Sequence, residues 1–500
     1  MPKATARPSV RRESGGDISM RLLLAASLLA LSTAAFGQSV PGIVAQPTKL
    51  EPKWQAKTRE IYETSVEIPT VAGRNQVPKL ADYLAGQLKA AGFAADDIKI
   101  MAYEGTEPND KTVALIARWR ADRPVAKPIL LMAHMDVVEA KREDWKQDPF
   151  EFIERDGYFY GRGSYDNKAG MVGLVASFLK LKAAGWKPRR DLILFFTGDE
   201  ETGGRGAALG AKEWRQLTDA EYALNSDGGG GAFQANGSSL GFGLQTAEKT
   251  YQSFEFTVRN KGGHSSRPRP DNAIYELATA LKKLESYRFQ PMLNETTRAY
   301  FTARAAQEGD NALGRAIRAW LANEKDAAAA DAIEANELEV GLTRTRCVAT
   351  ELQGGHADNA LPQMAQATVN CRIMPGISPD AIEAELEALV GKGIEVEKTR
   401  SYVGRPTPVS PLRADITKAY QDAVRALNGP NVPVIPLMST GATDGAFFRE
   451  QGLPVYGIDG SWVISPEDER AHGLDERMPV RAVYDNVVFW EMVLKQLAGK

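Results

Sequence analysis

The chain has 500 residues, which is longer than an average domain and favours a two-domain protein. Its composition is 43% hydrophobic and 25% charged, as in globular proteins, and this excludes wholesale disorder. The 61 Lys and Arg residues against 64 Asp and Glu residues leave a net charge of -3, which argues against a nucleic-acid partner. With only 2 cysteines, a disulfide scaffold, a cysteine-ligated zinc site and an iron–sulfur cluster are all excluded.

Residues 1–37 are predicted to be a signal peptide. The apolar run Leu22–Leu31 follows Arg21 and is too short to cross a bilayer as a helix. The small residues Ala35 and Gly37 suit cleavage before Gln38, and Met20 is a second candidate for the start of the protein. An uncleaved membrane anchor is the alternative. We expect an exported protein, periplasmic or secreted, with no membrane partner after cleavage.

Three short apolar segments predict buried parallel strands, namely Ile129–Ala133, Leu192–Phe196 and Val455–Ile458. Between the first two, Lys168–Ala184 has apolar residues at every third or fourth position and predicts a helix that stops at Gly185. The order strand, helix, strand is the βαβ unit of a doubly wound α/β sheet. We expect a catalytic domain with a mostly parallel central sheet, made of residues 38–250 and 406–500.

Residues 251–405 have the pattern of a second domain inserted into the first. The predicted order is β-α-β-β-α-β, which indicates a ferredoxin-like α+β lid. An Ala-rich, charged stretch at 294–339 predicts a helical elaboration of that lid. The predicted strands are 254–258, 346–352, 367–374 and 394–399, and the predicted helices are 271–287 and 379–389.

Histidines and acidic residues stand at or near the ends of the predicted strands. Each has an ordinary structural reading on its own, such as a helix cap for Asp166 or a solvated loop for Glu200 and Glu201. Together they are the mixture of nitrogen and oxygen ligands that suits Zn²⁺. Five ligands are too many for one tetrahedral catalytic zinc, and they suit two metals that share a carboxylate. The five are His134, Asp166, one of the adjacent Glu200 and Glu201, Asp227 and His472, and Asp136 stands beside His134.

Seven motifs occur in order along the chain: HMDVV (134–138), WKQDPF (145–150), YGRGSYDNKAG (160–170), GDEETGG (198–204), GGHSS (262–266), TDGAFF (443–448) and AHGLDERM (471–478). In these motifs the chain resembles the co-catalytic di-zinc peptidases. That family includes glutamate carboxypeptidase, carnosinase-like dipeptidases, vacuolar carboxypeptidase, acetylornithine deacetylase and the aminoacylases. The resemblance implies a zinc-peptidase catalytic domain with a dimerisation-type lid, and hence a homodimer through the lid domain.

The resemblance also implies a role for each candidate and two Zn²⁺ ions per subunit. His134 and Asp227 would bind one zinc, Glu201 and His472 would bind the other, and Asp166 would bridge the two ions. Asp136 would orient His134, and Glu200 would act as the general base. Relatives have Asp or Glu at the position of Asp227.

Three lid residues complete the predicted site. By resemblance Arg372 would bind a substrate carboxylate, since a guanidinium suits bidentate recognition, although it could be an ordinary strand-surface arginine. Asn359 matches a lid asparagine of the family. His264 would polarise the scissile carbonyl, and in dimeric relatives this histidine reaches the neighbouring subunit's site. The helical stretch 294–339 could block such a dimer or supply a substitute contact.

The predicted activity is hydrolysis of an amide bond next to a free carboxylate, by a carboxypeptidase or dipeptidase acting on a small peptide. An aminoacylase or deacylase that cleaves N-acyl amino acids is the alternative, because both reactions use the same residues. A binding protein that kept the fold and lost catalysis is a minor alternative. Such a binding protein would be expected to have lost a metal ligand or the general base, whereas this sequence has a suitable residue at each of these positions.

The two cysteines fall on neighbouring predicted strands of the lid. If Leu352 faces Gln366 in an antiparallel hairpin, Cys347 lies opposite Cys371. An exported protein can oxidise such a pair when the geometry is suitable. Two reduced, buried cysteines are the alternative.

Overall fold

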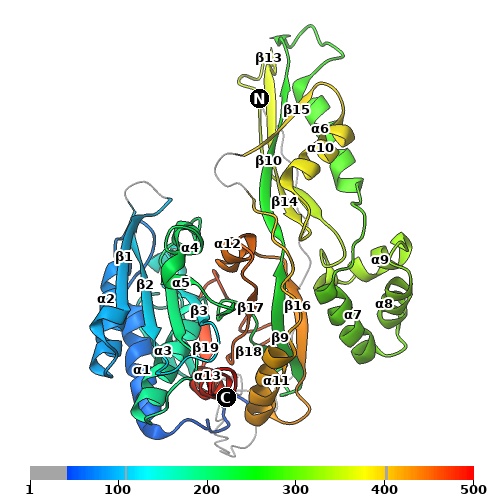
Figure 1. The fold of residues 1–500 in the computed structure, drawn as a ribbon. Coiled ribbons are helices and arrows are strands. Elements are labelled where there is room, and N and C mark those ends of the chain that lie inside the picture. Colours follow the sequence, from blue (N-terminus) through cyan, green and yellow to red (C-terminus); the bar gives the residue numbers. More distant parts are fainter. Residues whose placement is uncertain (1–41, 107–109, 400–403, 500) are drawn as a thin grey trace, which may run out of the picture. The chain divides into compact units, whose positions relative to one another are not determined.

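A computed structural model describes residues 42–106, 110–399 and 404–499 (Figure 1). The predicted signal peptide lies outside the described residues, and export stays a prediction. None of the helices in the described ranges is long and apolar enough to cross a membrane.

A 10-stranded sheet carries the candidate site. Its middle strands β6, β3, β7 and β17 run parallel to one another, whereas β2 and β1 extend one edge in antiparallel fashion. On the other side β9 pairs antiparallel with β17 and β8, and parallel with β16. The bounds are β1 Ile98–Glu104, β2 Lys111–Trp119, β3 Ile129–His134, β6 Leu192–Thr197, β7 Tyr222–Asn225, β8 Gly231–Phe233, β9 Ser239–Glu248, β16 Val434–Ser439, β17 Val455–Gly457 and β18 Trp462–Ile464. The predicted α/β class is confirmed, and three predicted strands are present with shifted ends.

Both faces of this sheet are covered, which explains why its strands are continuous apolar runs. In β3, Leu131 points to one face and Leu130 to the other, and each joins a different hydrophobic cluster. The first face is packed by α1 Pro52–Glu67, α2 Val77–Ala90, α3 Lys168–Ala183, α11 Ala414–Asn428 and α13 Val480–Ala498. The second is packed by α4 Arg205–Ala211, α5 Arg215–Thr218 and α12 Gly445–Glu450. The predicted helix 168–184 is α3.

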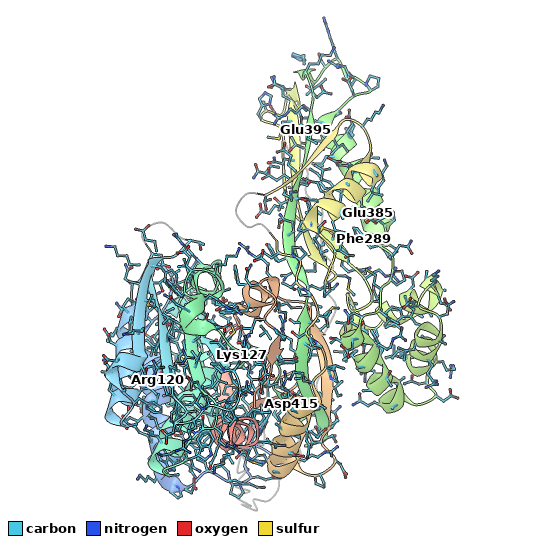
Figure 2. The ribbon with its side chains drawn as sticks, viewed as in Figure 1. Arg120, Lys127, Phe289, Glu385, Glu395 and Asp415 are labelled. Carbon is cyan, nitrogen blue, oxygen red and sulfur yellow. A yellow bond between two sulfur atoms is a disulfide. The ribbon has the colours of Figure 1, made fainter. Side chains whose placement is uncertain are left out.

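A separate 4-stranded antiparallel sheet forms the lid, in the order β12-β14-β10-β15. Along the chain the elements are β10 Thr250–Arg259, α6 Ala273–Ser286, β12 Arg346–Gly354, β14 Met364–Ile373, α10 Pro379–Val390 and β15 Ile394–Lys398. This is the predicted β-α-β-β-α-β order. The helices share one hydrophobic cluster with the strands, and Phe289 and Glu385 lie in that part of the lid (Figure 2). The domain limits 38–250, 251–405 and 406–500 stay a prediction.

The stretch 294–339 folds into α7 Glu295–Glu308, α8 Ala312–Ala322 and α9 Ala327–Glu334. The Asn294 side chain begins α7 with a capping box completed by Thr297. Phe301 and Trp320 lie at the centre of a small hydrophobic cluster made by these helices. Helix α7 also packs against β16 of the large sheet.

Two minor sheets complete the described elements. In the lid, β11 Gly263–His264 pairs antiparallel with β13 Ala360–Leu361 to form a 2-stranded sheet. Strands β4 Ile153–Arg155, β5 Tyr158–Tyr160 and β19 Arg477–Pro479 form a 3-stranded sheet in the order β19-β5-β4.

Cys347 and Cys371 form a disulfide between β12 and β14. They lie directly opposite each other in the antiparallel register, as predicted. The predicted register holds from Arg346 to Ala349, but a β-bulge between Ala349 and Glu351 shifts the pairing beyond it, so that Leu352 faces Ala367 instead of Gln366.

Candidate active site

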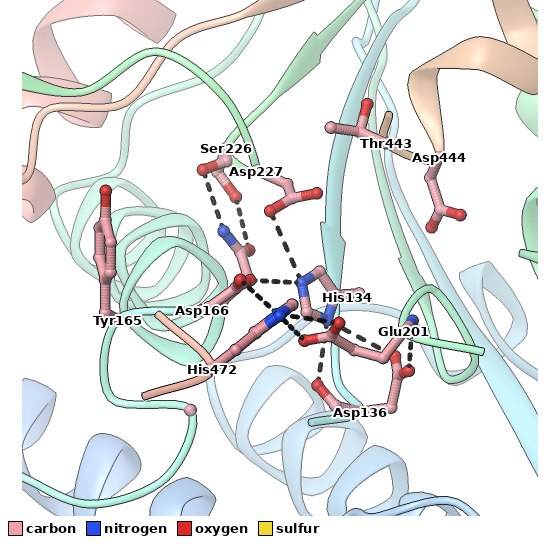
Figure 3. A network of polar contacts seen from close by, with 12 residues as sticks. His134, Asp136, Tyr165, Asp166, Glu201, Ser226, Asp227, Thr443, Asp444 and His472 are labelled. Carbon is pink, nitrogen blue, oxygen red and sulfur yellow. Dashed lines mark hydrogen bonds and ion pairs between the residues drawn. The ribbon is translucent and has the colours of Figure 1, made fainter. Parts of the chain in front are cut away.

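The candidate metal ligands meet where the parallel strands end (Figure 3). His134 is the last residue of β3, and Glu201 and Asp227 stand in the segments that follow β6 and β7. Asp166 stands just before α3. Parallel strands end at the same edge of a sheet, and open α/β folds place their sites there. His472 reaches this edge from the segment before β19, with a backbone φ of 60° that non-glycine residues rarely adopt.

His134 is buried at the centre of the first group. Its Nε2 lies 3.0 Å from Oδ1 of Asp166 and 3.6 Å from Oδ1 of Asp227. Its Nδ1 lies 3.0 Å from the backbone oxygen of Asp136 and 3.5 Å from that residue's Oδ1. An imidazole held at one nitrogen presents the other to a ligand in a fixed direction.

The second group forms around His472. Its Nε2 lies 3.0 Å from Oε2 of Glu201 and 3.2 Å from Oδ2 of Asp166. Asp166 thus faces one histidine with each carboxylate oxygen. Three groups have ligand atoms within 4.8 Å of one another: His134, Asp166 and Asp227; His134, Glu200 and Glu201; and Asp166, Glu201 and His472.

The charge at this centre is strongly negative. Burial, followed by the charge of neighbouring Asp227, raises the pKa of Glu200 well above its usual range. Burial also raises the pKa of Asp227 to about 6, whereas hydrogen bonds to Asp166 and Glu201 raise that of His472 to about 10. Oδ1 of Asp136 is buried without a hydrogen-bond partner. Such crowding of carboxylates is stabilised by a cation, and the His and carboxylate donors fit divalent metal ions.

Glu476 is a residue that sequence reasoning missed. Its buried carboxylate accepts hydrogen bonds from the backbone N–H groups of Gly163, Tyr165 and Asp166, at 3.1, 2.7 and 3.0 Å. It also pairs with Arg162 at 2.6 Å. These contacts fix the loop that carries Asp166. The sequence signal that could have identified Glu476 is its position in the AHGLDERM motif.

Two further buried acids were also missed. Asp199 accepts hydrogen bonds from the Tyr103 hydroxyl at 2.6 Å and from the backbone N–H groups of Arg205 and Gly206. It thereby holds the loop that carries Glu200 and Glu201. Asp444, in the TDGAFF motif, accepts a hydrogen bond from the Thr197 hydroxyl at the end of β6.

The predicted lid residues lie in two places. His264 is exposed on β11 and pairs with Ala360, next to Asn359. The backbone oxygen of Asn359 accepts a hydrogen bond from the backbone N–H of Ser265 at 3.0 Å. Arg372 on β14 stacks on the ring of Tyr251 at 4.6 Å and donates a hydrogen bond to the backbone oxygen of Thr440.

A covered α/β sheet, an α+β lid and a buried His–carboxylate centre at the strand ends are the features of a metal-dependent hydrolase. The family model "Peptidase family M20/M25/M40" matches residues 130–496, and the chain belongs to this family. It is therefore an enzyme of the metallopeptidase and amidohydrolase class, as the resemblance predicted.

Two relatives and one solved structure are similar to the chain. The chain is 30% identical to the human N-fatty-acyl-amino acid synthase/hydrolase PM20D1 over 375 residues, which are 73% of either chain. It is 26% identical to the probable carboxypeptidase S-like 2 of Dictyostelium discoideum over 393 residues, 76% of this chain and 74% of the relative. The structure of the dipeptidase Dug1p from Saccharomyces cerevisiae shares the fold, with a TM-score of 0.64, 16% identity, and coverage of 90% of this chain and 97% of that one.

Proposed function

We propose that the chain is a two-metal hydrolase of amide bonds that lie next to a free carboxylate. The observation that carries this proposal is Asp166, whose Oδ1 lies 3.0 Å from His134 and whose Oδ2 lies 3.2 Å from His472. A carboxylate that faces two separate ligand groups is suited to bridge two cations.

The ligand roles follow from the two groups. His134 and Asp227 would hold one ion, Glu201 and His472 the other, and Asp166 would bridge them. Imidazole and carboxylate ligands suit Zn²⁺, and we propose two Zn²⁺ per subunit. Two bound divalent ions would supply Lewis acidity at the scissile carbonyl and lower the pKa of water at the site.

Glu200 is proposed as the general base. It adjoins Glu201 in sequence and has a carboxylate oxygen within 4.8 Å of a ring nitrogen of His134. A glutamate with a raised pKa both accepts and returns a proton near neutral pH. It would take a proton from the attacking water and deliver it to the leaving amine, while the carbon–nitrogen bond breaks and the hydroxyl adds to the acyl carbon.

The lid supplies the proposed substrate contacts. Arg372 would bind the free carboxylate, Asn359 would contact the substrate, and His264 would donate to the carbonyl oxygen. The substrate would be a small peptide, as for a carboxypeptidase or dipeptidase. An N-acyl amino acid, as for an aminoacylase, is the alternative substrate. The name of one relative, a probable carboxypeptidase S-like protein, supports the peptide, and that of another, an N-fatty-acyl-amino acid synthase/hydrolase, supports the alternative.

Export and assembly are proposed on separate grounds. The run Leu22–Leu31 supports an exported, periplasmic or secreted enzyme. Strand β12 is an edge of the lid sheet, and Val348 and Leu352 on it are 61% and 67% exposed. An apolar edge strand of this kind supports a homodimer through the lid.

The test of the proposed function is metal content together with turnover. Asp166→Asn should lower the content of both metals and abolish hydrolysis of dipeptides and N-acyl amino acids. Asp422→Asn, which alters an exposed carboxylate on α11, is the control and should change neither. Loss of only one metal from the Asp166 variant would contradict the bridging role.

A further inference from the structure

A cavity of about 470 Å³ opens beside the candidate metal ligands and has an acidic lining. Among the described residues that form its wall there is no Lys, Arg or His, whereas four carboxylates belong to it. Its volume lies within the range of about 300–1,000 Å³ that is typical of small-molecule sites. We call this space the acidic cavity. Its carboxylates are those of Asp166, Asp227, Asp459 and Glu469.

The metal site accounts for only two of these carboxylates. Asp459 and Glu469 stand in the segments after β17 and β18, and they belong to none of the groups of described residues that could hold a metal ion. Their side chains accept hydrogen bonds from the hydroxyls of Ser461 and Ser465. A hydroxyl is neutral, so these contacts do not balance the charge of either carboxylate. Bound metal ions would therefore leave two carboxylates of the cavity without a cation.

Asp459 has an acceptor atom that the chain does not use. The residue is 5% exposed, and its Oδ2 accepts the hydrogen bond from Ser461. Its Oδ1 is buried and has no hydrogen-bond partner in the described part of the chain. An unsatisfied buried acceptor is costly, and more so when the group is charged. A cationic donor in the acidic cavity would supply the missing partner.

The phenol of Tyr165 also lines the cavity and responds to its charge. Burial, and after it the charges of all four cavity carboxylates, raise the pKa of Tyr165. Negative charges that oppose the loss of a proton from one group also favour the entry of a cation beside it. The acidic cavity is therefore suited to a positively charged group of a substrate.

The remaining wall suits an apolar stem that carries this charge. Leu240 of β9 and Leu437 of β16 line the cavity. The run Gly228–Gly231 leaves bare backbone in the wall, and a Cβ atom at Gly231 would overlap the ring of Phe242. Lysine and arginine side chains combine a methylene stem with a charged head. An α-ammonium group has no such stem and would leave most of this volume empty.

We propose that the acidic cavity binds the cationic side chain of the substrate residue on the acyl side of the scissile amide, and that the preferred substrates carry lysine or arginine there. This inference rests on the proposed function and deepens it by naming a substrate class. The carboxylate of the leaving residue is already assigned to Arg372 in the lid. The acidic cavity begins at Asp166 and Asp227 in the catalytic domain, and it is therefore assigned to the acyl side.

The first experiment measures kcat/KM of the metal-loaded full chain on Nα-acetyl-lysyl-leucine and Nα-acetyl-norleucyl-leucine, which differ only in the side-chain ammonium group. The lysine compound should be preferred about ten-fold, as expected for a hydrogen bond to a charged group. Norleucyl-leucine without the acetyl group carries an α-ammonium group instead, and it tests the other source of charge. Removal of the acetyl group should raise kcat/KM less than the lysine side chain does.

Variants locate the effect. Asp459→Asn keeps the size of the side chain and removes its charge, and it should lower the ratio of lysine to norleucine turnover about ten-fold. Glu469→Gln should lower the ratio in the same direction, and this exposed position keeps the test available if the buried variant fails to fold. The matched control is Glu467→Gln, which alters an exposed carboxylate outside the cavity lining and should leave the ratio unchanged. Ratios are compared within one protein sample, which removes differences in the folded fraction.

The outcomes separate this inference from the proposed function. Equal cleavage of the lysine and norleucine compounds, or a preference for the free α-ammonium alone, would overturn the side-chain assignment and leave the hydrolase intact. An unchanged ratio in the Asp459 and Glu469 variants would overturn the location, and so would loss of a metal ion from either variant. Failure to cleave any of these compounds would overturn the proposed function, and the inference with it.

Discussion

The backbone N–H of Glu201 donates a hydrogen bond of 2.9 Å to Oδ2 of Asp136. The resemblance implied only that Asp136 orients His134, and its Oδ1 does lie 3.5 Å from the imidazole Nδ1. The same carboxylate therefore spans the loops after β3 and β6. It couples the position of one proposed ligand to that of another.

This geometry predicts the effect of Asp136→Ala. Both contacts would be lost, and metal affinity should fall about 10–100-fold, as for other groups that orient metal ligands. Titration of the metal-free protein with Zn²⁺ by calorimetry measures the change. Asp144→Ala, at an exposed position on the same segment, should bind as the wild type does. Equal affinities in the two variants would contradict the orienting role.

The adjacent glutamates should respond differently to the same change. Glu200→Gln removes the base but keeps the proposed ligands, and it should retain both metals while turnover falls about 10²–10⁴-fold. Glu201→Gln should lower metal content as well, since a proposed ligand is weakened. Metal analysis of both purified variants checks this. If the two lose metal equally, the division of roles is wrong.

Arg372 should matter for substrates with a free α-carboxylate. Arg372→Ala removes a charge-assisted contact and should raise KM, lower kcat or do both. An amidated dipeptide should be a poor substrate of the wild type, and the variant should discriminate little between amide and acid. Equal cleavage of amide and acid by the wild type would favour an endopeptidase instead.

His264 tests mechanism and assembly together. His264→Ala should lose about 10²–10³-fold in turnover, as expected when one donor to a developing oxyanion is removed, while both metals stay bound. Mixing this variant with Glu200→Gln subunits distinguishes cis from trans action. Activity regained after subunit exchange means donation across a homodimer, and none despite proven exchange means a self-contained subunit. Full activity of His264→Ala alone would refute the role.

Lys249 predicts a pH dependence of stability. Burial lowers its pKa to about 7, against about 10.4 in an unfolded chain. Between these values the unfolded chain binds more protons, so this group makes stability rise with pH. Charges of Arg346 and Arg372 also lower the pKa, Glu334 opposes them, and the amine donates a 2.6 Å hydrogen bond to the Arg344 backbone.

Lys249→Met should abolish this contribution. The free energy of unfolding of the wild type, relative to the variant, should rise from pH 7 to pH 10 by up to about 1.4 kcal/mol per pH unit. Urea unfolding at several pH values measures the difference. The control is Lys212→Met, because Lys212 is an exposed lysine. A difference that does not change with pH would mean that Lys249 is charged in the folded chain throughout.

The sequence by itself determined the strands and helix that carry the site. Ile129–Ala133 and Leu192–Phe196 could be predicted as buried strands because a parallel sheet covered on both faces requires continuous apolar residues. Because such strands end at one edge, His134, Glu201 and Asp227 could be expected near one another. The opposition of Cys347 and Cys371 agrees with the prediction only because a β-bulge between Ala349 and Glu351 offsets a one-residue shift at Leu352, which faces Ala367.

Only the tertiary structure decided the contacts between residues that are far apart in the chain. Glu476 holds the Asp166 loop across about three hundred residues, and no local pattern marks a carboxylate as the acceptor of particular backbone N–H groups. The β-bulge between Ala349 and Glu351 likewise shifts the pairing of β12 with β14, and it could not be predicted from the sequence. The cavity beside Asp166 and Asp227 is lined both by Gly228–Gly231 and by Tyr300 of α7, and the shape of a cavity is a property of packed surfaces rather than of any one segment.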